Sequence, residues 1–189
     1  MHVPPPSEPP TISATFHLTD HNGRDVDAGS FRGSFVLVFF GFTHCRVVCP
    51  RALTRLSAAL DALGEIPVRV AALYITVDPD RDSPQVMRNY LRAYPSILGL
   101  TGSRAQIDDA KRNFRVFARR SSPSPDDGSY DVPHTAITYL LDPEGRLVAH
   151  FNDAIEVGDL IQRLSSHLKH YSPDGPERIS SAHRAVPPC

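Results

Sequence analysis

Two cysteines, Cys45 and Cys49, lie four positions apart, directly after an apolar run and directly before Pro50. They are two of only three cysteines in a chain of 189 residues. A pair this close, in this setting, usually handles either a metal ion or a redox equivalent, because the thiolate is both a metal ligand and a nucleophile. The residue before a proline is biased away from helical angles. We therefore expect Cys49 in the loop that enters a helix with Pro50 at its first position, where the helix N-terminus and Arg46 favour the thiolate.

The spacing of the pair leaves both chemistries open. On a regular helix, positions i and i+4 place their Cβ atoms about 5–6 Å apart, whereas a disulfide needs about 3.5–4.5 Å. A metal bonded to sulfur at about 2.3 Å tolerates the wider spacing, and a loop can still close a reversible disulfide. Structural zinc takes four ligands, and the chain has no second close pair of cysteines. Copper(I) is therefore the favoured ion, because thiolate selects it.

A third ligand has to come from another residue type, and the chain has nine histidines. His134 is our choice because it lies just before an expected strand, and ligands gather at strand ends in α/β sheets. The alternative is an ordinary solvated loop histidine. His44 is adjacent to Cys45, and adjacent side chains tend to point apart, and His150 lies within an expected strand. His167 and His170 are interpreted as favourable charge at a helix end.

An acidic segment follows the second buried strand. Its three carboxylates, Asp78, Asp80 and Asp82, are compatible with a site for a hard cation. We favour a turn instead, with Ser83 as the cap of the following helix and Arg81 in a structural salt bridge. Upstream, Phe39 and Phe40 are predicted to lie in the core, whereas Phe42 lies near the thiols, and its exposure would mark it as a docking residue.

The rest of the chain alternates strand and helix patterns. Continuous β-branched and aromatic runs predict strands buried on both faces, and apolar residues at helical spacing predict the helices between them. An Asn-Gly dipeptide predicts a hairpin near the start. The expected strands are 15–18, the stretch around Val26, 35–40, 68–77, 97–100, 135–141 and 146–151, and the expected helices are 50–63, 84–94, 104–117 and 157–168. This order predicts an α/β layered fold with a partly parallel sheet.

Composition limits the classes of function. A net charge of −1 gives no electrostatic grip on nucleic acid, and no apolar run is long enough for a membrane helix. Residues 1–10 and 172–189 are predicted to be disordered, with Cys189 outside the fold, and residues 11–171 form one domain. The start of the chain lacks the pattern of a signal peptide. The protein is therefore either cytosolic or separated here from an export or anchor segment, and we prefer the second explanation.

Four motifs in order resemble the Sco/SenC family of copper chaperones. They are Gly41-Phe42-Thr43-His44-Cys45 with Cys49-Pro50, the stretch from Thr76 to Pro84, the stretch from Gly99 to Gly102, and His134-Thr135. The resemblance covers about residues 15–168. It implies a thioredoxin-like fold with an N-terminal β-hairpin extension and a central mixed sheet flanked by helices.

The resemblance also implies a function. One copper ion, Cu(I) or Cu(II), would be bound by Cys45, Cys49 and His134. It would be delivered to the CuA centre of cytochrome c oxidase, through the subunit that carries CuA or another copper donor or acceptor protein. Family members are typically tethered to a membrane, so we expect a periplasmic or membrane-anchored protein that faces the periplasm.

Three residues depart from the family pattern. Arg46 and Val47 replace a Pro-Asp pair, and Pro133 stands where an aspartate commonly precedes the histidine, with Asp131 two positions earlier. A carboxylate beside a ligand histidine can orient its ring, so these departures leave an alternative open. That alternative is a thiol–disulfide oxidoreductase acting on partner cysteines through Cys45 and Cys49. A peroxidase-like activity would need a reactive thiol in an open pocket.

Overall fold

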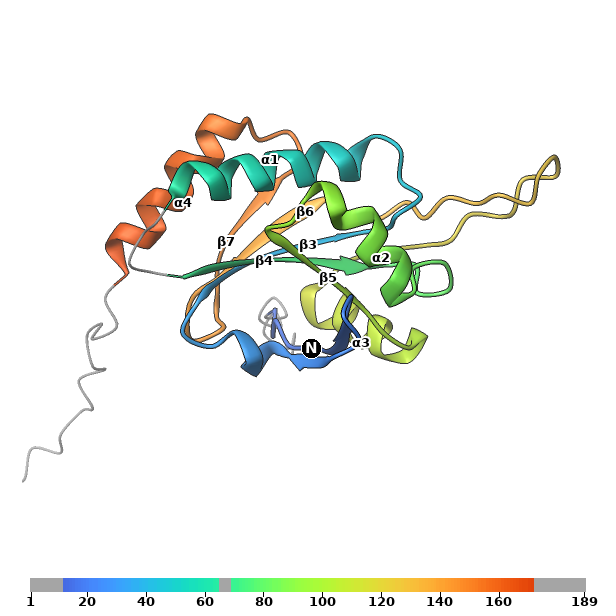
Figure 1. Ribbon diagram of the computed structural model, residues 1–189, viewed down its shortest axis with the longest axis horizontal. Coiled ribbons are helices and arrows are strands. Elements are labelled where there is room, and N and C mark those ends of the chain that lie inside the picture. The colour runs from blue at the N-terminus through green and yellow to red at the C-terminus, as the bar shows by residue number, and fades with distance from the viewer. Residues whose placement is uncertain (1–11, 65–68, 172–189) are drawn as a thin grey trace, which may run out of the picture.

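A seven-stranded sheet organises the protein, whose computed structural model describes residues 12–64 and 69–171 (Figure 1). The strands are β1 (His17–Asp20), β2 (Asp25–Asp27), β3 (Phe35–Gly41), β4 (Val70–Thr76), β5 (Ile97–Thr101), β6 (Ile137–Leu141) and β7 (Leu147–Asn152). Their order across the sheet is β2-β1-β5-β4-β3-β6-β7. The two segments predicted to be disordered, 1–10 and 172–189, lie outside the described residues, and so does Cys189.

Parallel and antiparallel pairing are mixed, as the sequence predicts. β3 pairs in parallel with β4, and β4 with β5, whereas β1, β6 and β7 join antiparallel. β1 and β2 form the expected N-terminal hairpin, with the turn at Gly23, whose φ is +84°. Positive φ is readily available only to glycine, which explains the Asn-Gly signal. The predicted strand from 35 to 40 is confirmed, because every residue of β3 is buried.

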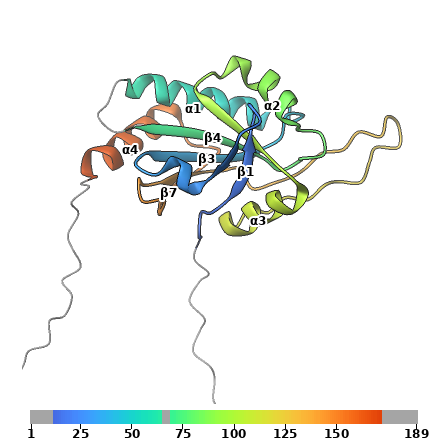
Figure 2. The ribbon, with the colours of Figure 1, turned by 60° about the horizontal axis from the view of Figure 1, so that its bottom comes forward.

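Helices cover both faces of the sheet. They are α1 (Val48–Leu63), α2 (Pro84–Tyr90), α3 (Arg104–Phe114) and α4 (Val157–His170), with short 3-10 turns at Ala28–Phe31 and Leu91–Ala93. α1, α2 and α4 lie on one face and α3 lies on the other, which both views show (Figures 1 and 2). Alternate residues of β3 serve the two faces: Leu37 and Phe39 pack with α1 and α4, whereas Val38 and Phe40 pack with α3.

Two predicted helices are too long. The helix expected over 84–94 ends at Tyr90, where the chain passes into the 3-10 turn at Leu91–Ala93. The apolar spacing extended the third helix to Phe117, but α3 ends at Phe114, and Phe117 is 66% exposed. Arg115 adopts a left-handed conformation with φ +57°, and the amide of Val116 donates back to the carbonyl of Lys111. This left-handed cap ends the helix. The predicted Ser103–Gln106 capping box at the other end of α3 is confirmed.

Between α3 and β6 the chain runs out from the body and returns. Amides and carbonyls pair across this excursion, from Arg119 to Pro133, from Ser121 to Asp131 and from Thr135 to Phe117. We call residues 117–135 the arm. It projects at the same end of the sheet as the loops that follow β3 and β4 (Figure 1). Three segments that are distant in sequence therefore meet at the carboxyl ends of the parallel strands, where α/β sheets place ligands.

Candidate metal centre

The two cysteines lie side by side where β3 passes into α1. The backbone amide of Cys49 donates a hydrogen bond to Sγ of Cys45 at 3.4 Å. Both are free thiols, Cys45 being half-buried and Cys49 completely buried. Solvent and partners can therefore reach the pair only through Cys45.

The start of α1 differs from the expectation. The helix begins at Val48, so Cys49 is already helical and Pro50 is the third residue of the helix, not the first. The first four amides of a helix have no partner within it, so a proline is tolerated anywhere in the first turn. Tertiary packing of Cys49 into the core then overrides the weak preference of a residue before proline.

The expectation that Cys49 favours the thiolate is wrong for this conformation. Burial raises the pKa of the Cys49 thiol to about 12, although the hydroxyl of Tyr74 and the amide of Phe42 act to lower it. The exposed side chain of Arg46 does not offset this desolvation. A metal ion that binds here must displace the proton of Cys49, which links metal affinity to pH.

Gly41, the last residue of β3, makes room for the buried sulfur. A Cβ at this position would lie 2.6 Å from Cys49 Sγ and 2.6 Å from the hydroxyl of Tyr74. No real Cβ tolerates such contacts, so only glycine fits between the thiol and the tyrosine. The first residue of the Gly41-to-Cys45 motif thus has a packing role.

His134 lies at the base of the arm, paired with Ala118 across it. Its Nδ1 is 2.8 Å from the carbonyl of Val132. Because a carbonyl only accepts, Nδ1 carries the proton, and Nε2 keeps a free lone pair. Nε2 is buried and has no hydrogen-bond partner within residues 12–64 and 69–171. An orphaned imidazole nitrogen of this kind suits a metal ligand.

The imidazole packs edge-on against the ring of Phe42, with centroids 5.7 Å apart. Phe42 is buried, so the condition for a docking role is not met. In the described part of the chain, no group of three or more His, Cys, Asp or Glu side chains is close enough to hold a metal. The structure thus places His134 on the segment next to the thiols, without closing the three side chains into one cluster.

The acidic segment between β4 and α2 is structural, as the sequence analysis favours. Asp82 is fully buried and accepts hydrogen bonds from the Thr76 hydroxyl at 2.6 Å and from the amide and hydroxyl of Thr43 at 3.0 and 2.6 Å. Ser83 caps α2. Desolvation raises the pKa of Asp82. This carboxylate therefore ties the cysteine loop to the end of β4.

Arg81 connects the acidic segment to the arm. It pairs with Asp78, which confirms the predicted salt bridge, and donates to the carbonyl of Tyr130 at 3.1 Å. The Tyr130 ring lies between the guanidinium groups of Arg81 and Arg120, at 3.6 and 3.5 Å from its centroid, and its hydroxyl donates to Asp78 at 3.0 Å. These contacts hold the segment that carries His134 against the loop after β4.

Sequence reasoning missed Tyr74 and Tyr130. Tyr74 lies within the apolar run of β4 and is completely buried. Burial of a hydroxyl without a partner costs free energy, so a tyrosine in a strand buried on both faces could have been recognised from the sequence as a candidate functional residue. Tyr130 offers no such signal, because its two arginine neighbours come from distant positions.

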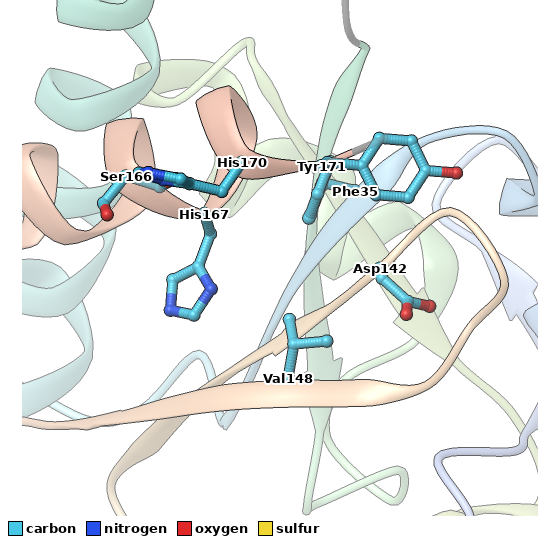
Figure 3. A pocket seen from close by; sticks show the side chains of 7 residues that line it. All are labelled: Phe35, Asp142, Val148, Ser166, His167, His170 and Tyr171. Atoms are coloured by element: carbon cyan, nitrogen blue, oxygen red, sulfur yellow. The ribbon is translucent and has the colours of Figure 1, made fainter. Parts of the chain in front are cut away.

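The structure also places the four other histidines considered from the sequence. His44 is exposed and close to the hydroxyl of its neighbour Thr43, and His150 is exposed on β7. His167 and His170 line an open pocket of about 350 Å³ at the opposite end of β3, beside Phe35 (Figure 3). Their predicted place at the end of α4 is confirmed.

Across the described residues, no helix combines the length and the apolar character needed to cross a membrane.

Comparison with solved structures confirms the thioredoxin-like fold. Yeast Sco1 with copper bound matches with a TM-score of 0.80 and 33% identity, over 87% of this chain and 92% of that chain. ScoI of Bradyrhizobium japonicum with copper bound matches with a TM-score of 0.74 and 40% identity, over 82% and 98% of the two chains. Relatives of this protein have thus been solved with copper.

Sequence comparison leads to the same family. The zebrafish (Danio rerio) mitochondrial SCO2 homologue is 37% identical over 82% of this chain. The chain spans only 56% of the length of that relative. The family profile described as SCO1/SenC matches residues 4–169. The chain belongs to the SCO1/SenC family.

Proposed function

We propose that this protein binds one copper ion through Cys45, Cys49 and His134 and delivers it to the CuA centre of cytochrome c oxidase. The observation that carries the proposal is the free lone pair of His134 Nε2, buried on the segment beside two adjacent thiols. Two sulfurs and one imidazole form a donor set that suits copper. The copper-bound structures of relatives from yeast and Bradyrhizobium support the choice of ion.

Copper is the cargo of this site. Each residue has a separate task in holding it. Cys49 gives a sulfur shielded from solvent, Cys45 gives one that a partner can reach, and His134 adds a neutral nitrogen. The backbone carbonyl of Val132 orients the imidazole, a task that a carboxylate beside a ligand histidine can also perform. This contact supports His134 as a ligand although Pro133 stands in place of the aspartate of the family pattern.

Copper titration of single variants tests the ligand set. Under anaerobic conditions, competition with a Cu(I) chelator should give one ion per wild-type chain, and Cys45→Ser, Cys49→Ser and His134→Ala should each lose at least tenfold in affinity. His44→Ala, next to the loop cysteine but exposed, is the matched control and should bind like wild type. Unchanged affinity in His134→Ala would show that the three-ligand site is wrong.

Delivery is tested separately from binding. The copper-loaded protein is mixed with the purified soluble domain of the CuA-carrying subunit, and the CuA absorption is followed. Growth of that absorption, absent with the Cys45→Ser variant, supports delivery.

We place the full-length protein at a membrane and facing the periplasm, and protease accessibility in intact spheroplasts tests this location.

A second candidate function is thiol–disulfide exchange. The contact of Cys49 N with Cys45 Sγ at 3.4 Å brings the pair close, and Cys45 is accessible. In this reaction the two thiols form a disulfide, and a partner disulfide takes the two electrons and two protons to become a dithiol. Equilibration with glutathione buffers measures the potential. A pair that stays reduced at every physiological ratio would exclude the exchange.

A further inference from the structure

Tyr74 places a hydroxyl against the buried sulfur of the candidate site. It lies in β4, opposite Phe39 in β3, and is completely buried. Its ring is stacked between Phe39 and Tyr90, with centroid distances of 6.2 and 6.0 Å. The hydroxyl and Cys49 Sγ both lie 2.6 Å from the position that a Cβ on Gly41 would occupy, so the two atoms border the same point. The stacked rings hold the tyrosine in this position.

This hydroxyl has no hydrogen-bond partner within the described part of the chain. Leaving a buried donor unsatisfied costs about 1–3 kcal/mol, and phenylalanine would fill the same space without that cost. The neighbouring group is the sulfur of Cys49. A thiol sulfur is a weak acceptor, and a thiolate is a strong one. The sulfur of Cys49 therefore becomes a strong acceptor for this hydroxyl when a metal ion displaces the thiol proton.

We propose that Tyr74 is a positioning residue whose hydroxyl donates a hydrogen bond to the Cys49 thiolate when copper binds. The inference rests on the proposed copper function and deepens it. The hydrogen bond from Tyr74 offsets part of the desolvation of the thiolate and fixes the direction of the sulfur lone pairs.

The hydrogen bond has an electronic consequence that packing alone would not produce. A donor to a coordinating sulfur withdraws electron density and weakens the sulfur-to-copper donation. Without it, the sulfur-to-copper(II) charge-transfer absorption moves to longer wavelength. The affinity for copper falls as well, by about tenfold, the lower end of the range for partners of metal ligands.

The test compares Tyr74→Phe with Tyr139→Phe. Tyr139 is also a buried tyrosine but packs on the α3 face of the sheet, with Phe40 and Phe114, so it controls for the removal of a tyrosine hydroxyl from the core side of the sheet away from Cys49. Three quantities are measured on wild type and both variants: the Cu(I) affinity by chelator competition, the position of the Cu(II) charge-transfer band, and the thermal midpoint of the apo protein. Tyr74→Phe should lose about tenfold in affinity and shift the band, with a thermal midpoint equal to or above that of wild type.

The outcomes separate the two proposals. If wild type binds copper and Tyr74→Phe matches Tyr139→Phe in affinity and band position, the role of Tyr74 is wrong while the copper function stands. A lower thermal midpoint in Tyr74→Phe with an unmoved band would show a purely structural role and also overturn the inference. Failure of wild type to bind copper would overturn the proposed function itself.

Discussion

Asp82 accepts hydrogen bonds from both the amide and the hydroxyl of Thr43, a residue 39 positions earlier in the chain. This contact joins the loop after β4 to the loop that carries the cysteines. Because Asp82 is fully buried, desolvation raises its pKa above the ordinary value of 3.8. When charged, the Asp82 carboxylate holds the loop through these hydrogen bonds, but its desolvation lowers the free energy of unfolding.

The pH dependence of stability should reveal this cost. The folded protein binds the Asp82 proton more tightly than the unfolded chain does, so its contribution is largest below a pH of about 3.8 and is lost as the pH rises through the raised pKa. Asp82→Asn keeps the shape of the side chain and an oxygen acceptor. We expect the free energy of unfolding of wild type, minus that of Asp82→Asn, to decrease as the pH rises from 4 toward neutral, measured by urea unfolding. An increase over the same range would contradict the raised pKa.

Alkylation should distinguish the two thiols. A shift of the Cys49 pKa from 9.0 to about 12 leaves about a thousandfold less thiolate at pH 8 than an ordinary thiol has. Iodoacetamide should therefore label Cys45 first and Cys49 at least a hundredfold more slowly, as peptide mass spectrometry can measure in a Cys189→Ser background. In urea the two sites should react alike. Equal rates in the native protein would show that Cys49 is accessible or ionised.

Gly41→Ala should disturb the site through packing alone. The new methyl group would overlap Cys49 Sγ and Tyr74, and overpacking of this kind costs about 1–3 kcal/mol. Gly158 is the matched control, because it lies in α4 and a Cβ there meets nothing within 4 Å. Gly158→Ala should be neutral or stabilise by up to about 1 kcal/mol. Thermal or urea unfolding of both variants measures the contrast, and equal stabilities would contradict it.

Tyr130→Leu should loosen the arm. It removes two cation–π contacts and the hydrogen bond to Asp78, which together are worth about 1.5–3.5 kcal/mol. Hydrogen exchange at the amides of Arg119 and Thr135, which pair across the arm, should accelerate at least about tenfold. Ser122→Ala, also on the arm but exposed, provides the control. Protection equal to that of wild type would mean that the arm is held by its backbone pairing alone.

Most of the fold was predictable from the sequence, because the strands and helices carry strong local signals. β3 is a continuous apolar run, and the caps at Ser83 and Ser103 are typical of helix starts. The end of α3 was not predictable, since a left-handed Arg115 has no signature comparable to that of glycine. The prediction followed the apolar spacing to Phe117, which the structure exposes.

The candidate site was predictable only in part. Residue type and spacing point to the two cysteines, and position before a strand points to His134. Burial is a property of the assembled core, so the raised pKa of Cys49 and the helical conformation before Pro50 could not be read from neighbouring residues. The contacts that hold the arm, around Arg81 and Tyr130, join residues 49 positions apart, so they cannot be recognised from neighbouring residues in the sequence.

The unequal burial of the two sulfurs has a consequence for direction. An incoming ligand from a partner protein can approach Cys45, whereas Cys49, in the first turn of α1, has none of its surface open. In the proposed transfer, exchange of copper with a partner would therefore be sequential, with Cys45 releasing the ion first and Cys49 last. Arrival and departure of the ion would both proceed through Cys45.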